Sequence, residues 1–138
     1  MEAVVVDTDV VSFSMRRDSR ARPYEKFLAN CVPCVSFMTI AEMRFGAELA
    51  RWGAKRLEAM EQALKHYTVL PLDDATSREF ARVGAEQYRN GRNQLNRSDW
   101  WIAATAKSRG LRVLTHNARH FEGIDGLSVV TFAKVEGS

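Results

Sequence analysis

The feature that most constrains the fold is a short run of β-branched residues near the start of the chain, Val4-Val5-Val6, which ends at Asp7. A continuous apolar run of this kind is typical of a strand that is buried on both faces of a parallel sheet. Strand-like and helix-like segments alternate after it. We expect strands over 34–37, 68–70, 111–114 and 129–132, and helices over 9–15, 23–30, 38–52, 54–66, 74–90 and 98–109. This alternation predicts an α/β fold of three layers, in which helices flank a mostly parallel sheet.

The length of the chain, 138 residues, corresponds to about one domain. Because no linker, internal repeat or low-complexity segment divides it, we expect a single domain over residues 1–138. Charged residues make up 27%, close to the average for soluble proteins, which argues against global disorder. The sequence holds no run of 18 apolar residues and no basic-then-apolar signal pattern at its start. We therefore expect a cytoplasmic protein without a membrane span.

The positive charges are mostly arginine, which accounts for 15 of the 20 basic residues in a chain of net charge +3. They form two clusters, one of four arginines within 16–22 and one of eight Lys and Arg within 78–112. A guanidinium group binds phosphate oxygens through two parallel hydrogen bonds, and nucleic-acid binding requires patches of such groups. Two solvated protein faces would have the same composition. Charge alone therefore leaves a nucleic-acid partner and an ordinary surface both open.

Two cysteines, Cys31 and Cys34, have the Cys-x-x-Cys spacing of redox and zinc-binding pairs. A redox pair normally opens a helix, whereas Cys34 leads into an expected strand. No second ligand pair stands at the spacing that a zinc site needs. We interpret both residues as ordinary interior thiols.

Polar side chains from separate segments gather at the edge where the carboxyl ends of the strands meet: Asp7, Asp9, Glu42, Asp99, Asn117 and His120. In open α/β sheets, ligands bind beyond these carboxyl ends. Clustered carboxylates repel one another unless a cation neutralises them, and their oxygens are the ligands that Mg²⁺ and Mn²⁺ prefer. Such an ion lowers the pKa of a water molecule and polarises a phosphoryl oxygen. Together with the arginine clusters, these acids predict a metal-dependent nuclease.

Each acid also has a structural interpretation. Asp7 suits a turn after a strand, and Asp9 suits a helix N-cap. Glu42 has the capping-box spacing to Thr39, and Asp99 is favourable near a helix N-terminus because of the helix dipole. Taken singly, the structural interpretation is the stronger one for Glu42 and Asp99. Three acids on one edge together favour the metal site.

Four segments of the chain resemble the motifs of PIN domains. Asp7-Thr8-Asp9 resembles their D-T-N/D opening, and residues 36–46 resemble their S-x-x-T-x-x-E-x-x-x-G segment. Residues 99–106 resemble D-x-x-I-A-A-x-A, and residues 115–121 resemble T-x-N-x-x-x-F. The four motifs occur in order and span nearly the whole chain. Their spacing most resembles that of VapC-type toxins of type II toxin–antitoxin systems.

This resemblance implies a PIN-like fold and a Mg²⁺- or Mn²⁺-dependent endoribonuclease that cuts RNA with an activated water. The residues that it implies as metal ligands are Asp7, Glu42 and Asp99, with Asn117 as a further catalytic residue and Thr8, Asp9 and Thr115 in support. Many members of the family carry a carboxylate at or near the positions of Asn117 and His120. Because this chain has none there, the number of bound metal ions stays open.

The same resemblance implies a cognate antitoxin that covers the site, and a homodimer. The helices 38–52 and 54–66 carry more apolar residues than one small face requires, among them Phe45, Leu49, Trp52, Leu57 and Met60. We expect them to contribute to association. The identity of the antitoxin and the RNA sequence that is cut are not encoded in any motif.

Two other functions remain open at this stage. Asp7-Thr8-Asp9-Val10-Val11 also fits the D-x-D-x-[T/V] opening of haloacid-dehalogenase-type phosphatases, but no later G-D-x-x-x-D acid pair follows. A catalytically impaired PIN-like module that only binds RNA or protein is the second alternative, since a fold does not fix a function. Trp52, Trp100 and Trp101 could stack on bases, but at helical spacing we expect core or interface residues.

Overall fold

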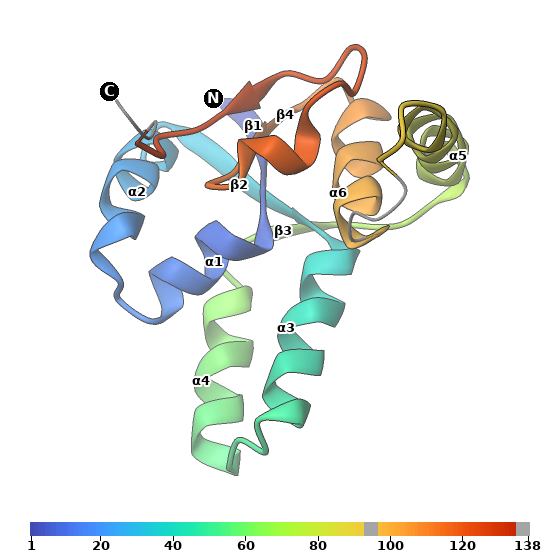
Figure 1. Ribbon diagram of the computed structural model, residues 1–138. Coiled ribbons are helices and arrows are strands. Elements are labelled where there is room, and N and C mark those ends of the chain that lie inside the picture. Colours follow the sequence, from blue (N-terminus) through green and yellow to red (C-terminus); the bar gives the residue numbers. More distant parts are fainter. Residues whose placement is uncertain (93–96, 135–138) are drawn as a thin grey trace.

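Figure 1 shows the computed structural model of the chain, which describes residues 1–92 and 97–134. Its centre is a five-stranded sheet of strand order β3-β2-β1-β4-β5, in which every neighbouring pair is parallel. The strands are β1 (Glu2–Val6), β2 (Cys31–Ser36), β3 (Thr68–Leu70), β4 (Arg112–Leu114) and β5 (Val129–Val130). The expected parallel α/β architecture is confirmed.

Helices connect the strands and cover both faces of the sheet (Figure 1). They are α1 (Thr8–Met15), α2 (Arg22–Leu28), α3 (Phe37–Leu49), α4 (Ala54–Leu64), α5 (Asp74–Arg89) and α6 (Arg97–Lys107), with 3₁₀ segments η1 (Ser19–Ala21) and η2 (Ala118–Phe121). In the part of the chain that the structure describes, no helix combines the length and apolarity that a membrane crossing requires.

The alternating side chains of β1 divide the core into two halves. Val4 and Val6 pack with residues of α1, α2, α3 and α4 on one face. Val5 packs on the other face with residues of α5 and α6. All three valines have no exposed surface, as a central strand covered on both sides requires. The sheet therefore forms the middle of three layers, and its carboxyl edge is left for chemistry.

Strand β2 begins three residues earlier than the predicted strand 34–37, and Phe37 belongs to α3 instead. Pro33 lies inside β2, opposite Val4 of β1. Pairing of β2 with β3 starts only at Cys34, so at Pro33 the strand is still an edge on that side, where a residue without an N–H is tolerated. Cys31 and Cys34 are free thiols within this strand, and Cys34 is buried.

The start of α3 corrects the predicted capping box. The N-cap is Ser36, whose hydroxyl accepts a hydrogen bond from the Met38 N–H at 3.1 Å. Thr39 and Glu42 therefore lie inside the helix and do not cap it. The capping interpretation of Glu42 is wrong, because the strand ends at a buried serine that takes the N-cap position first.

Candidate active site

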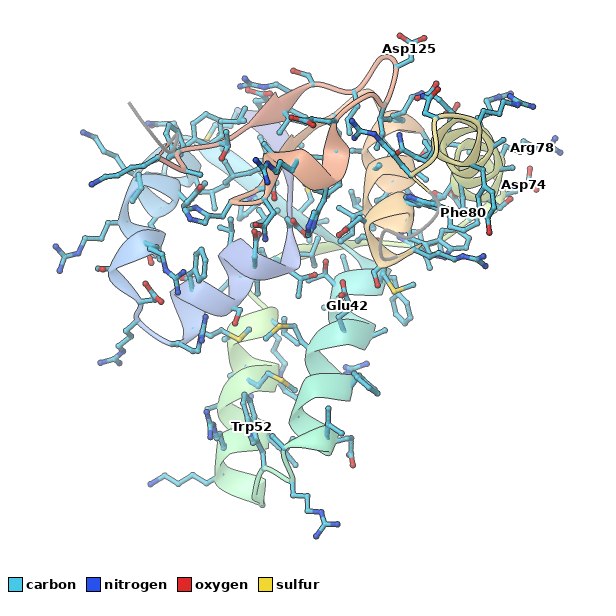
Figure 2. All side chains as sticks on the ribbon, in the orientation of Figure 1. Glu42, Trp52, Asp74, Arg78, Phe80 and Asp125 are labelled. Carbon is cyan, nitrogen blue, oxygen red and sulfur yellow. The ribbon has the colours of Figure 1, made fainter. Side chains whose placement is uncertain are left out.

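Three helices begin where the central strands end, and they bring the predicted residues to one place. Asp7 directly follows β1 and caps α1, Glu42 lies in the second turn of α3, and Asp99 lies in the first turn of α6. Figure 2 shows Glu42 at the end of α3 that faces the starts of α1 and α6. The segment after β4, which contains Asn117, completes the edge.

Asp7 is the most buried acid of the cluster, with 4% of its surface exposed. Its Oδ1 accepts the Thr8 N–H at 2.8 Å, and its Oδ2 accepts the Thr115 hydroxyl at 2.7 Å. Burial raises the pKa of Asp7 well above its ordinary value, and the nearby carboxylates of Asp9 and Asp99 raise it further. Both oxygens are thus held in place in a site that disfavours their charge.

Asp9 connects α1 to the segment after β4. Its Oδ1 accepts the Val10 N–H at 2.7 Å. Its Oδ2 accepts two hydrogen bonds, from the backbone N–H of His116 and from Nδ2 of Asn117, each at 3.1 Å. Asp9 is therefore not the N-cap of α1, and Asn117 contacts the cluster through its amide nitrogen.

Glu42 is held by a chain of hydroxyl groups. Oγ1 of Thr8 donates to Oε1 of Glu42 at 2.9 Å, and Oγ1 of Thr39 lies 2.9 Å from the same Thr8 oxygen. Because the single Thr8 hydroxyl proton is used for Glu42, Thr39 must donate to Thr8. Burial raises the pKa of Glu42, and the hydrogen bonds from Thr8 and Ser98 oppose that rise. The spacing of Thr39 to Glu42 predicts a capping box, and the same spacing is the only sequence signal for this chain of hydroxyl groups.

Asp99 faces the cluster from α6. Burial raises its pKa to about 6; the nearby His120 lowers it, and the carboxylates of Glu42 and Asp9 raise it. Nδ1 of His120 lies 3.1 Å from Oδ2 of Asp99. His120 is predicted at this edge, but no sequence motif assigns it a role. The structure makes it the side chain that partners Asp99.

The donor set matches a hard divalent cation, because it consists of carboxylates whose repulsion only a cation or protons relieve. Within residues 1–92 and 97–134, no three His, Cys, Asp or Glu side chains are arranged to hold a metal ion as they stand. Glu42 is turned to Thr8, and Asp99 is turned to His120.

The two arginine clusters differ in their partners. Six of the eight cations within 78–112 form ion pairs: Arg78, Arg82, Arg92, Lys107, Arg109 and Arg112. In the first cluster only Arg20 does so, with Asp18, among the residues described. The first cluster, at the end of α1, thus keeps more charge available for phosphate.

Trp100 is buried in the core beside Phe80, as expected.

Comparison with known proteins gives consistent matches. A family model described as PIN domain matches residues 4–127. The tRNA(fMet)-specific endonuclease VapC of Shigella flexneri is 32% identical over 124 residues, which cover 89% of this chain and 92% of the relative. Ribonuclease VapC2 of Haemophilus influenzae is 31% identical over 127 residues, with 89% and 92% covered.

Solved structures agree with these relatives. The DNA-bound VapBC structure from Salmonella typhimurium is similar with a TM-score of 0.82 and 28% identity, over 95% of this chain and 98% of that chain. The FitAcB structure from Neisseria gonorrhoeae is similar with a TM-score of 0.77 and 28% identity, over 91% and 95%.

Proposed function

The chain belongs to the PIN domain family and, within it, to the VapC ribonucleases, and from this premise we propose that Asp7, Glu42 and Asp99 bind Mg²⁺ or Mn²⁺ and cut RNA. The protein is an endoribonuclease toxin that an antitoxin neutralises. Family membership also removes the phosphatase alternative, because Asp7-Thr8-Asp9 is accounted for as the opening of a PIN domain.

The observation that carries the metal proposal is the placement of three acids at one edge of the sheet, where Asp7 and Asp99 are buried. Asp7, Glu42 and Asp99 come from three different helix starts, and burial and mutual repulsion disfavour their charged forms. A purely structural role would favour partners that stabilise the carboxylates, as Arg20 does for Asp18 elsewhere in the chain. A cluster that costs stability in this way is typical of a functional site.

The chain's own residues fix most of the geometry that cleavage needs. Thr8 and Thr115 hold both oxygens of Asp7, and Asn117 and the His116 N–H hold Asp9. When bound, a divalent ion supplies a water of lowered pKa and stabilises the charge that develops on the phosphate. Asp7, Glu42 and Asp99 would hold this ion, and Thr8 and Thr115 keep the Asp7 carboxylate in place. Arg16, Arg17 and Arg22, which form no ion pair with the residues that the structure describes, bind the RNA backbone.

We propose tRNA as the first substrate class to test, because the relative from Shigella flexneri, and another from Salmonella typhimurium, are named tRNA(fMet)-specific endonucleases. The protein, purified free of antitoxin, is incubated with tRNA and with an unstructured RNA, with Mn²⁺ or with EDTA. We expect cleavage that EDTA stops and that Asp99→Asn abolishes. The matched control is Asp125→Asn, on a loop remote from Glu42 in Figure 2. Cleavage that persists in EDTA or in Asp99→Asn contradicts the proposal.

One observation favours a second function, an RNA- or protein-binding module without catalysis. Asn117 stands where the resemblance to PIN domains implies an acid, and its amide donates a hydrogen bond to Asp9. Such a module binds RNA equally well with EDTA or Mn²⁺ and leaves it uncut. The cleavage assay above separates the two functions in one experiment.

We propose that the exposed face of α3 forms a homodimer interface. Phe37, Ala41, Phe45 and Leu49 recur every four residues along this helix, and the three large ones are 49%, 68% and 74% exposed. Met60, which we expected in the same surface, is instead buried in the core. Exposed apolar stripes of this kind are typical of protein interfaces. Phe45→Glu is expected to yield a monomer in sedimentation with the fold retained, and an unchanged dimer contradicts this assignment.

A further inference from the structure

The hydroxyl of Tyr24 joins three segments that are far apart in the sequence. Tyr24 lies on α2 and has no exposed surface. Its Oη lies 2.6 Å from Nδ1 of His116, accepts the Phe132 N–H at 3.1 Å, and lies 3.5 Å from the Thr115 carbonyl oxygen. The ring of Phe132 packs edge-on against the Tyr24 ring. One buried oxygen thus fixes the segment after β4 and the segment after β5.

The segment after β4 in turn holds two acids of the candidate site. Thr115 donates its hydroxyl to Asp7, while the His116 N–H and the Asn117 amide donate to Asp9. The Asn117 N–H donates to Oγ1 of Thr115, which closes the turn. Any displacement of residues 115–117 therefore moves the partners of both carboxylates together.

The His116 side chain connects this segment to Phe13 and Tyr24, not to the acids. Its ring packs edge-on against Phe13 and against Tyr24, with ring centroids 5.2 Å and 5.7 Å apart. The Nδ1 contact to Tyr24 is satisfied with either nitrogen protonated, since a tyrosine hydroxyl both donates and accepts. The imidazole ring of His116 is thus held by ring contacts with Phe13 and Tyr24 and by the contact of its Nδ1 with the Tyr24 hydroxyl.

We propose that Tyr24 and His116 are positioning residues for RNA cleavage, which hold residues 115–117 so that Asp7 and Asp9 keep their productive orientation. The cleavage part of this inference rests on the proposed function, whereas the holding of the segment does not. Neither side chain touches the reacting groups. Their effect is on preorganisation, and a displacement of about 1 Å costs on the order of a hundredfold in rate.

Tyr24→Phe tests this directly, because it removes one oxygen and keeps the buried ring. The first readout is backbone amide exchange in the metal-free protein, followed by NMR. Loss of one buried hydrogen bond is expected to speed exchange at His116 and Asn117 by about threefold to tenfold. Exchange at Val5 and Val6, in the centre of the sheet, is expected to stay at the parent rate. Unchanged exchange at His116 overturns the proposal.

The second readout is the kinetics of RNA cleavage. If the hydroxyl positions the acids, kcat falls by about tenfold and KM for RNA stays unchanged, because the RNA-binding surface is intact. A merely structural role predicts a loss no greater than the fraction of unfolded protein. The matched control is Tyr67→Phe, which removes a hydroxyl at the amino end of β3, opposite the site edge. It is expected to leave exchange at His116 and kcat unchanged.

A double-mutant cycle tests whether the two residues act as a pair. His116→Leu and Tyr24→Phe are measured singly and together. If both act through the 2.6 Å contact, the double variant is no worse than the worse single variant, whereas independent roles give additive losses and overturn the pairing. If the parent protein cuts no RNA, the proposed function fails, and the exchange data alone then decide the positioning claim.

Discussion

At the scale of the residue, a substitution of Glu42 distinguishes most clearly between a metal-binding role and a role in the structure of the helix. The structure removes the capping role, since Ser36 caps α3 and Glu42 accepts a hydrogen bond from Thr8 instead. Gln has the same shape and still accepts that bond, but it lacks the charge that Mg²⁺ needs to offset its loss of hydration. Glu42→Gln is therefore expected to reduce RNA cleavage at least tenfold, about 1.4 kcal/mol of transition-state stabilisation.

Glu42→Gln also has an expected effect on the stability of the protein. Removing one charge from a cluster of repelling acids is expected to leave the melting temperature of the metal-free protein equal to the parent's or slightly higher. Cleavage at the parent rate under low metal concentration would show that Glu42 is not a ligand. A large drop in melting temperature would show that its role is structural.

The raised pKa of Asp99 predicts how the stability of the folded protein depends on pH. A carboxyl whose pKa is higher in the folded protein than in the unfolded chain binds its proton more tightly when folded. Its contribution to folding is complete below the unfolded pKa and is lost as pH rises through about 6, the folded value for Asp99. Asp7 and Glu42 shift in the same direction. The metal-free protein is therefore expected to melt several degrees lower at neutral pH than near pH 5.

Calorimetry of the parent and of Asp99→Asn across this range checks the prediction. The variant has one titrating group fewer, so its melting temperature is expected to fall less steeply between about pH 5 and 7. The acids with lowered pKa, such as Asp18 and Asp73, lose their contribution only at lower pH and do not mask this effect. Parallel curves for the two proteins would contradict the role of Asp99.

At the scale of the element, Arg109 ties the end of α6 to the start of α5. Its Nη1 donates to the Thr76 hydroxyl and the Thr105 carbonyl, each at 3.0 Å, and its Nη2 donates to the Pro71 carbonyl at 2.9 Å. Its side chain is 19% exposed. A lysine keeps the charge but cannot reproduce a planar fork of donors. Arg109→Lys is expected to lower the free energy of unfolding by about 1–3 kcal/mol.

Urea unfolding measures this loss against a matched control, Arg78→Lys. Arg78 pairs with Asp74 on the exposed side of α5, where an ion pair contributes at most about 0.5 kcal/mol. Cleavage per folded molecule is expected to be unchanged in both variants, because neither residue lies at the carboxyl edge of the sheet. Equal losses for the two variants would refute the structural role of Arg109.

The type of each element could be predicted from the sequence, whereas the starts of β2 and α3 could not. Helix and strand alternation followed from apolar periodicity, and the carboxyl edge followed from the alternation. The start of β2 depends on which strand lies beside Pro33, and the start of α3 depends on Ser36 being buried at a strand end. Both are tertiary facts, so local propensity placed these boundaries a few residues away.

At the scale of the whole molecule, the meeting of the three acids at one edge could be predicted, and their hydrogen-bond partners could not. Asp7 and Glu42 follow the ends of β1 and β2, and Asp99 lies in the first turn of α6, which precedes β4. The 3₁₀ segment η2 that brings His120 to Asp99 has no sequence signature of its own. Charge alone left the role of the basic cluster within 78–112 open, and some of its ion pairs could not be predicted because the partner is remote in sequence, as in the pairing of Arg112 with Glu2.

The most direct test is a titration of the metal-free protein with Mn²⁺, followed by electron paramagnetic resonance, beside RNA cleavage at the same Mn²⁺ concentrations. If Asp7 anchors the ion, Asp7→Asn loses both Mn²⁺ binding and cleavage, while the parent and Asp125→Asn bind Mn²⁺ and cut RNA over the same concentration range. If Asp7→Asn binds Mn²⁺ and cuts RNA like the parent, the buried acids are not the catalytic metal site.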